Sequence, residues 1–270
     1  MKNGEFNYEI TTPTGVLKSR PLRDEDIGKA VGMLVSVTKS NYKEIFGIGC
    51  TGSYTKSGAL LETDRGAIER FVRKDQYQTC GIWAQDGEML AWMAGHTGGM
   101  QDSYFTSKDD FVFEAGCENA WQDWQNAIQR GTMVSECCMM VKQPARYPHV
   151  GLILLKAWSR VLLAIGKTVG VTEVDCVCAC TDADGTHELN LDNKGSLYNM
   201  GFIGHRVVAK RVYDEIRVDE GITVKCISRV FQGTIQEMNS RLHTVMEKID
   251  IHIEAVSDET KEKELCSVTF

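Results

Sequence analysis

The segment "MVSECCMMVKQPARYPHVGLILLKAW", from Met133 to Trp158, decides how this chain folds. Its first nine residues, Met133 to Val141, form a compact apolar run that predicts a buried strand. A polar turn with two prolines separates that strand from an apolar helix, which we place at Gly151–Gly166. Because the helix is apolar almost all round, it is expected to be buried on several sides.

The start of this helix has the features of an anion site. The first backbone N–H groups of a helix have no acceptor within it, and its dipole favours negative charge there. Gly151 lets the backbone approach a ligand closely, and Arg146 adds a positively charged fork beside it. A diphosphate accepting several charge-assisted hydrogen bonds, each worth about 1.5–3 kcal/mol, needs few basic side chains. Arg146 is otherwise a surface arginine on a turn.

The remaining pattern predicts strands and helices on both sides of this segment. Asp24 is expected to cap a helix that runs from Glu25 to about Ser40. Asp86-Gly87 between two β-rich segments is a hairpin signal. The other predicted helices are at 59–74, 118–129 and 234–253, and the predicted strands are at 15–19, 78–84, 88–96, 171–181, 206–212 and 223–231.

Composition narrows the function classes. The 270 residues are 43% hydrophobic and 25% charged, as in an ordinary globular protein. The net charge of −7 argues against a nucleic-acid partner, which needs a basic face. No run approaches the roughly 20 apolar residues of a membrane span, and the first twenty residues lack the apolar core of a secretory signal. We therefore expect a cytoplasmic protein without a membrane partner.

The ten cysteines have no repeating spacing and are expected to be reduced thiols. Cys176, Cys178 and Cys180 share one face of a predicted strand, because side chains alternate along a strand. A zinc site would need ligands from turns and a second cluster, so a buried strand face is the better interpretation and no metal is predicted. The turn Asp182–Gly185 lacks the final glutamate of a calcium loop.

Arg146-Tyr147-Pro148-His149-Val150-Gly151 resembles the acyl-CoA signature of the GNAT acyltransferase superfamily, (Gln/Arg)-x-x-Gly-x-(Gly/Ala). Three further features occur in that family's order: "RPLRDEDI" at 20–27, the Asp-Gly hairpin, and "NLDNKGSLYNMGF" at 190–202. The resemblance covers about residues 16–230. It implies an α/β (α+β) fold with a mixed, mostly antiparallel central sheet flanked by helices.

The chain departs from the family in four places. His149 replaces the first glycine of the signature, so the turn must accommodate a Cβ atom. Tyr198 lies three residues before Gly201, where the family more often has four. An insertion at about 97–131 precedes strand four, and an extra helix follows the last strand. We predict a GNAT-like domain at 1–231, followed by a C-terminal helix and charged tail at 232–270.

The resemblance implies where coenzyme A would bind. The turn between strand four and the next helix would hold the pyrophosphate, and the backbone of strand four would pair with the pantetheine arm where strands four and five splay. A loop asparagine would also contact the coenzyme, unless it is an ordinary loop or cap residue. His149 either contacts a phosphate or only fills a turn position. The implied coenzyme residues are Met139, Met140, Val141, Arg146, His149, Val150, Gly151, Leu152 and one or both of Asn190 and Asn193.

Acyl transfer to an amine needs a neutral nucleophile. A lysine-like amine has a pKa near 10.4, so its deprotonation at pH 7 costs roughly 4–5 kcal/mol. By resemblance, Glu136 is the candidate base and Tyr198 the candidate proton donor to the departing thiolate. The alternative for Glu136 is a side chain that faces solvent at the start of its strand, and the alternative for Tyr198 is a half-buried tyrosine that packs on the sheet.

The function implied is transfer of an acetyl group from acetyl-CoA to the amine of a small or amino-acid-like molecule. The loop 47–58 and the insertion 97–131 are expected to shape the acceptor site. Trp121 and Trp124 either line that pocket or form one packed helix face. Two alternatives are a long-chain N-acyltransferase fed by an acyl carrier protein and a non-catalytic coenzyme A sensor. A homodimer is left open.

Replacing Arg146 by alanine is expected to weaken coenzyme affinity by roughly 1.5–3 kcal/mol, the contribution of one charged hydrogen bond. Calorimetric titration with coenzyme A measures this change. Unchanged affinity would remove Arg146 from the site.

Replacing Tyr198 by phenylalanine is expected to lower turnover more than coenzyme affinity, because only proton donation to the leaving thiolate is lost. Steady-state rates and a binding titration on the same variant separate the two effects. Wild-type turnover would end the proposed role of Tyr198.

Overall fold

The computed structural model describes residues 6–46, 53–54, 60–62, 64–97, 107–130, 132–142, 147–168, 175–183, 187–188, 203–219 and 222–256. Its helices are α1 (Ile27–Phe46), α2 (Asp64–Arg73), α3 (Ala120–Arg130), α4 (Val150–Thr168) and α6 (Ile235–Lys248), with 3₁₀ turns at Asp24–Asp26 and Lys108–Asp110. Its strands are β1 (Tyr8–Thr12), β2 (Gly15–Arg20), β3 (Ser53–Tyr54), β4 (Leu60–Glu62), β5 (Tyr77–Ala84), β6 (Met89–Thr97), β7 (Phe111–Phe113), β8 (Met133–Val141), β9 (Asp175–Ala183), β10 (His187–Glu188), β11 (Arg206–Asp219), β12 (Ile222–Thr234) and β13 (His252–Ala255).

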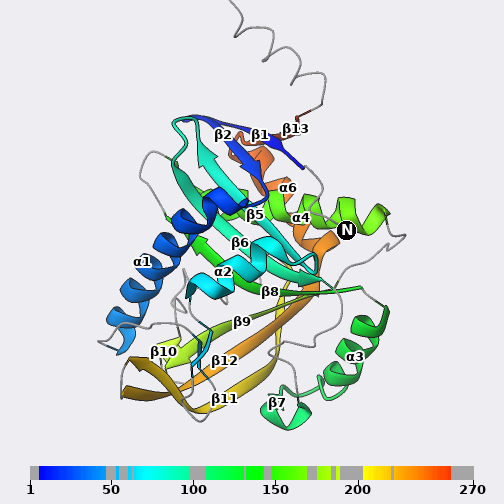
Figure 1. The fold of residues 1–270 in the computed structure, drawn as a ribbon. Helices are drawn as coiled ribbons and strands as arrows, with labels where there is room; N and C mark the ends of the chain where they lie inside the picture. The colour runs from blue at the N-terminus through cyan, green and yellow to red at the C-terminus, as the bar shows by residue number, and fades with distance from the viewer. Residues whose placement is uncertain are drawn as a thin grey trace, which may run out of the picture.

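One large sheet organises the molecule (Figure 1). Its strand order is β13-β1-β2-β5-β6-β8-β9-β12-β11-β7, with β10 paired to β9, and a separate hairpin joins β3 to β4. Across the described residues β8 and β9 form the one parallel pair, and all other pairs are antiparallel. The prediction of a mixed, mostly antiparallel sheet flanked by helices is confirmed.

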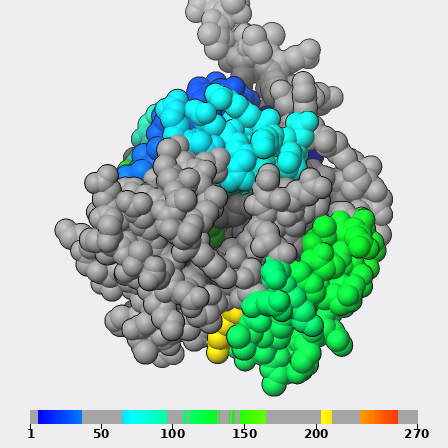
Figure 2. All heavy atoms as spheres, turned by 60° about the horizontal axis from the view of Figure 1, so that its bottom comes forward, coloured from blue at the N-terminus to red at the C-terminus, as the bar shows by residue number. Residues whose placement is uncertain are grey.

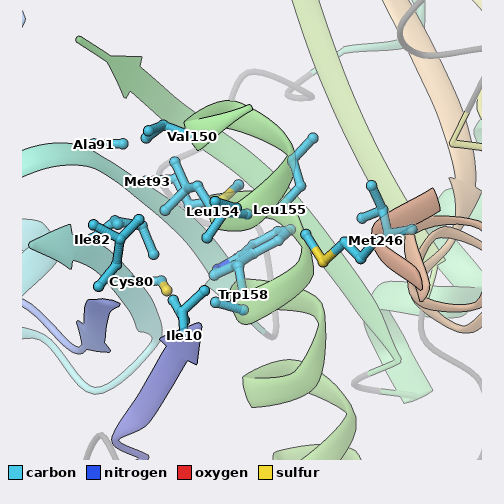
Figure 3. Close-up of a cluster of buried hydrophobic side chains, with 14 of the residues drawn as sticks. Ile10, Cys80, Ile82, Ala91, Met93, Val150, Leu154, Leu155, Trp158 and Met246 are labelled. Atoms are coloured by element: carbon cyan, nitrogen blue, oxygen red, sulfur yellow. The ribbon is translucent and has the colours of Figure 1, made fainter. Parts of the chain in front are cut away.

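Helices cover both faces of the sheet. On one face α4 and α6 pack against β1, β2, β5 and β6, and Trp158 lies in the centre of that core with Ile10, Leu154 and Met246 around it (Figure 3). On the other face α1 and α2 cover a second core that includes Trp83 and Trp92. Every residue of β5 is buried, because both of its faces are covered. No described helix is long and apolar enough to cross a membrane.

The start of α1 differs from the prediction at Asp24. Asp26 rather than Asp24 provides the side-chain hydrogen bond at the start of the helix. Its carboxylate accepts a hydrogen bond from the Arg23 backbone N–H at 2.8 Å. The same carboxylate accepts from Arg20 Nη2 at 3.0 Å and is buried. Asp24 instead accepts from Arg73 Nε at 2.8 Å on the surface. The cap therefore comes from the third residue of the turn, through a contact that also fastens β2.

The C-terminal helix ends earlier than predicted and leads into an unpredicted strand. α6 stops at Lys248, and Asp250 adopts a positive φ of 55° that turns the chain back. β13 then pairs with β1, which was not predicted either, in antiparallel register. α6 is part of the core that contains α4. The domain boundary at residue 231 stays a prediction.

The described part of the insertion forms a small aromatic cluster at one edge of the sheet. β7 pairs with β11, and Trp124 donates its indole N–H to Gln232 Oε1 of β12 at 2.8 Å. Trp121 and Trp124 pack with Phe111 at centroid distances of 5.9 and 5.8 Å. Figure 2 shows residues 107–130 (green) as a continuous surface beside the start of β11 (yellow). The interpretation of the two tryptophans as a packed helix face is confirmed.

Gly81→Ala is expected to lower the free energy of unfolding by about 1–3 kcal/mol through overpacking. A Cβ at Gly81 would lie 2.2 Å from the Trp83 ring, and Arg20 stacks over that ring at 4.0 Å, so the indole cannot move away freely. Urea unfolding measures the change.

Gly28→Ala is the matched control, because a Cβ there meets nothing within 4 Å and the position lies in α1. It is expected to raise stability by up to about 1 kcal/mol through helix propensity. Equal effects at both positions would contradict the steric argument.

Candidate functional site

The candidate site lies where β8 and β9 separate. Their parallel pairing joins Met133–Ser135 to Asp175–Val177. Beyond these residues the described pairing holds β8 to β6 and β9 to β12, so the two strands diverge from a shared start (Figure 1). β10 pairs with β9 at Asp182 and Ala183. The result is a fork in the sheet. Along its two facing edges, the backbone N–H and C=O groups of β8 and β9 do not hydrogen-bond to each other.

A β-bulge lies at the apex of this fork. In the β6–β8 ladder Ala94 pairs with Cys138 and Gly95 pairs with Glu136, which leaves Cys137 as the extra residue. A bulge leaves its extra residue outside the ladder and turns the strand locally. It comes two residues after the parallel pairing ends at Ser135. Backbone amides at the apex are therefore freed from regular sheet pairing.

A turn at residues 148 and 149 directly precedes α4. The helix begins at Val150, and the first bond that closes a helical turn runs from the Ile153 N–H to the His149 carbonyl at 3.0 Å. The N–H groups of Val150, Gly151 and Leu152 come before it and have no acceptor within the helix. The first turn contains no acidic side chain that would compete for them. This start of α4 is suited to an anion.

The first turn of α4 and the end of β8 face each other. A Cβ at Gly151 would lie 3.7 Å from Met139 Cε and 3.8 Å from Val141 Cγ2. These are ordinary contact distances, so packing within the protein does not require a glycine there. The structure thus brings together four predicted coenzyme residues, Met139, Val141, Gly151 and Leu152. Val150 is buried beneath the same turn.

His149 adopts the left-handed conformation, with a φ of 67°. Glycine favours this region because it has no Cβ, and other residues enter it at a cost of roughly 1–2 kcal/mol. The His149 side chain is exposed, so its Cβ meets solvent rather than a neighbour. The turn was predicted to accommodate the Cβ of His149. It does so because the side chain lies in solvent, at the cost of a strained backbone conformation.

Tyr147 fastens the turn to the sheet. Its ring lies 3.7 Å from the position of a Cβ on Gly15, in the tight turn between β1 and β2. Tyr147 also packs against the core that contains α4. The turn before α4 is thus held from the side of β1 and β2.

Several predicted site residues lie outside the described structure. These are Arg146, Asn190, Asn193 and Tyr198. For Glu136 and Met140 the structure describes the backbone but not the side chain. Their roles stay predictions. Among the side chains that are described, no three of His, Cys, Asp or Glu gather in a way that could hold a metal ion.

Lys156 is a charged residue near the site that the sequence analysis did not single out. It is only 6% exposed, and its ammonium donates to the Asn239 carbonyl at 2.7 Å and to Asn239 Oδ1 at 2.8 Å. Its pKa is lowered to about 8, first by burial and then by the positive charge of Arg160, while Glu247 raises it. A lysine flanked by apolar residues on a mostly apolar helix was the signal that could have identified it.

His149→Gly is expected to raise the free energy of unfolding by about 0.5–1 kcal/mol, since the strain is relieved and no packing is lost. His149→Val is expected to lower it by about 1 kcal/mol or more, because a β-branched residue tolerates positive φ least. Urea unfolding of both variants measures the difference. A valine variant as stable as the glycine variant would contradict the left-handed assignment.

No protein-family model matches the sequence, and no curated protein is similar to it. Solved structures are similar in fold. Mycobacterium smegmatis RimJ in complex with CoA-disulfide is 11% identical, aligned over 90% of this chain and 96% of that chain with a TM-score of 0.45. A Sinorhizobium meliloti GNAT superfamily phosphinothricin acetyltransferase in complex with AcCoA is 10% identical over 81% and 88%, with a TM-score of 0.45.

The aminoglycoside 6'-N-acetyltransferase from Enterococcus faecium is 10% identical over 80% of this chain and 96% of that chain, with a TM-score of 0.42. All three likenesses extend over most of both chains at low identity.

Proposed function

We propose that this protein is an acyl-CoA-dependent N-acyltransferase that moves an acetyl group from acetyl-CoA to the amine of a small or amino-acid-like molecule. The observation that carries the proposal is the fork between β8 and β9, with a bulge at its apex and the start of α4 facing the end of β8. Each of these three features has backbone N–H groups that would donate hydrogen bonds to a different part of acetyl-CoA.

The pyrophosphate would accept hydrogen bonds from the N–H groups of Val150, Gly151 and Leu152. Charge-assisted hydrogen bonds at a helix start contribute about 1.5–3 kcal/mol each, so three of them hold a diphosphate without a large basic patch. This agrees with a chain whose net charge is −7. The absence of an acidic residue in the first turn of α4 supports the same reading.

The pantetheine arm would lie along the free edge of β8 from the bulge toward Val141. An extended chain with amide groups can pair with an exposed strand edge as an added strand does. The side chains of Met139 and Val141 lie between that edge and Gly151. The arm would thus lead from the start of α4 to the apex of the fork, where the thioester would lie beside the bulge.

At the bulge a freed amide is a donor to the thioester carbonyl. Preorganised donors aimed at a developing oxyanion stabilise it, and losing one such donor costs about 2.7–4 kcal/mol in well-studied cases. The amine attacks the carbonyl carbon, the C–N bond forms and the C–S bond breaks. Glu136 or a chain of water molecules takes the proton from the amine, and Tyr198 protonates the departing sulfur; both roles rest on the sequence.

The acceptor site is proposed to lie on the loop 47–58 rather than on the described part of the insertion. β7 joins the sheet at β11, which β12 separates from β9. With strands about 4.8 Å apart, this places β7 about 14 Å from β9 along the sheet. Residues 98–106 of the predicted insertion directly follow β6 in sequence and remain candidates.

The direct test is thiol release from acetyl-CoA in the presence of a panel of primary amines, including amino acids, polyamines and aminoglycosides. Amine-dependent release above the hydrolysis background supports the transferase. Binding of acetyl-CoA without any amine-dependent release favours a non-catalytic coenzyme sensor, for which the strained His149 in place of glycine is the supporting observation.

Gly151→Pro is expected to weaken acetyl-CoA binding by about 1.5–3 kcal/mol, because proline removes one of the three N–H groups that would contact the pyrophosphate. The helix itself does not use that N–H, so the variant should stay folded. Isothermal titration measures the affinity, and circular dichroism checks the fold.

Gly151→Ala is the matched control. It keeps the N–H, its Cβ meets only ordinary contacts, and the acyl-CoA signature admits alanine here. Wild-type affinity is expected. Equal affinity of the proline and alanine variants would show that the amide of residue 151 is not a ligand contact.

A further inference from the structure

The helix α4 carries an unbalanced positive charge. Its sequence, VGLILLKAWSRVLLAIGKT, contains Lys156, Arg160 and Lys167 and no acidic residue. The chain as a whole is acidic, with a net charge of −7. Because all the charged residues of α4 are basic, a negatively charged group close to the helix would stabilise it.

Lys156 is the buried member of this set. Both of its hydrogen bonds go to neutral oxygens of Asn239 on α6, at 2.7 and 2.8 Å. Ser159 completes the cluster, because its hydroxyl lies 2.8 Å from the Lys156 carbonyl and 3.1 Å from Asn239 Oδ1. No carboxylate of the described residues forms an ion pair with Lys156.

The charged groups around Lys156 do not compensate it. Arg160, one turn further along α4, lies over the Tyr8 ring and donates to the Ile253 carbonyl, so it adds a second cation with a neutral acceptor. Glu247 of α6 attracts the ammonium from a distance and is paired with His243. Buried charges are ordinarily paired, because an unpaired ion in the interior is costly.

Lys156 stands behind the start of α4. Lys156 is five positions after Gly151 in sequence, which corresponds to about 7.5 Å along the helix axis at 1.5 Å per residue. Side chains of a helix lean toward its N-terminus, which brings the lysine closer to the first turn. Between two such charges an interior of low effective dielectric transmits more attraction than water does.

We propose that Lys156 is a positioning residue of the coenzyme site, a buried cation whose counter-charge is the phosphate bound at the first turn of α4. The inference rests on the proposed function. It explains how the site holds a diphosphate with few basic side chains on its surface. It also couples coenzyme binding to protonation, because a bound phosphate favours the charged form of the lysine.

The direction of the pH effect follows from the lysine. In the unliganded protein the ammonium is charged below about pH 8 and loses its proton above it. Acetyl-CoA affinity is therefore expected to fall about threefold to tenfold from pH 7.5 to pH 9.5, as the counter-charge is lost. Stability of the unliganded protein is expected to rise over the same range, since the folded-state pKa is depressed and the unfolded chain binds more protons.

Titration calorimetry with acetyl-CoA from pH 7.5 to pH 9.5 tests the proposal on the wild type and on Lys156→Met. Acetyl-CoA has no free thiol to titrate in this range. The methionine variant is expected to bind more weakly than the wild type at pH 7.5 and to lose most of the pH dependence. Lys29→Met is the matched control, because this exposed lysine on α1 donates to the Gly87 carbonyl on the opposite face. It is expected to keep the wild-type profile.

A second measurement needs no variant. Binding enthalpies of the wild type at pH 8.5, in two buffers with different heats of ionisation, report proton uptake on coenzyme binding. Uptake supports the proposal. Binding without proton uptake and with a flat pH profile, or a methionine variant that keeps the wild-type profile, overturns it and leaves the proposed function standing. No binding of acetyl-CoA at any pH overturns both.

Discussion

The packing of α4 against the sheet is the constraint on which the other features depend. Ile153, Leu154, Ala157 and Trp158 are completely buried between the sheet and α6, as Figure 3 shows for Leu154 and Trp158. Because protein interiors are close-packed, a helix held on two sides in this way cannot rotate or slide without losing many contacts. The orientation of its first turn toward the end of β8 is therefore set by apolar contacts well away from the site.

The hydrophobic pattern identified the elements that contain this core. Met133–Val141 was predicted with the bounds that the structure gives to β8, and the helix after it starts one residue earlier than expected. The Asp86-Gly87 hairpin was predicted for the same reason, since turn chemistry and apolar periodicity are both local. β13 was missed because it is four residues long and pairs with β1 across more than 200 residues of sequence, and β1 is itself only five residues long.

The site was predictable in part. The signature around Gly151 marked the start of α4, yet the fork and the bulge at Cys137 depend on pairing between strands that no local pattern records. The cap by Asp26 rather than Asp24 depends on Arg20, which reaches the carboxylate from β2. Lys156 was passed over because the sequence does not show whether a lysine in an apolar helix reaches solvent, whereas the structure shows that it is buried and bound to Asn239.

The bulge at Cys137 also divides β8 into two halves with different phase. Side chains alternate between the faces of a strand, and one extra residue reverses that alternation. Met139 and Val141, which follow the bulge at alternate positions, both lie against Gly151 of α4. Deleting Cys137 would reverse the alternation between the two halves, so Met139 and Val141 would no longer lie on the α4 side while the first half kept its place. The one extra residue in β8 therefore decides that Met139 and Val141, rather than their sequence neighbours, meet α4.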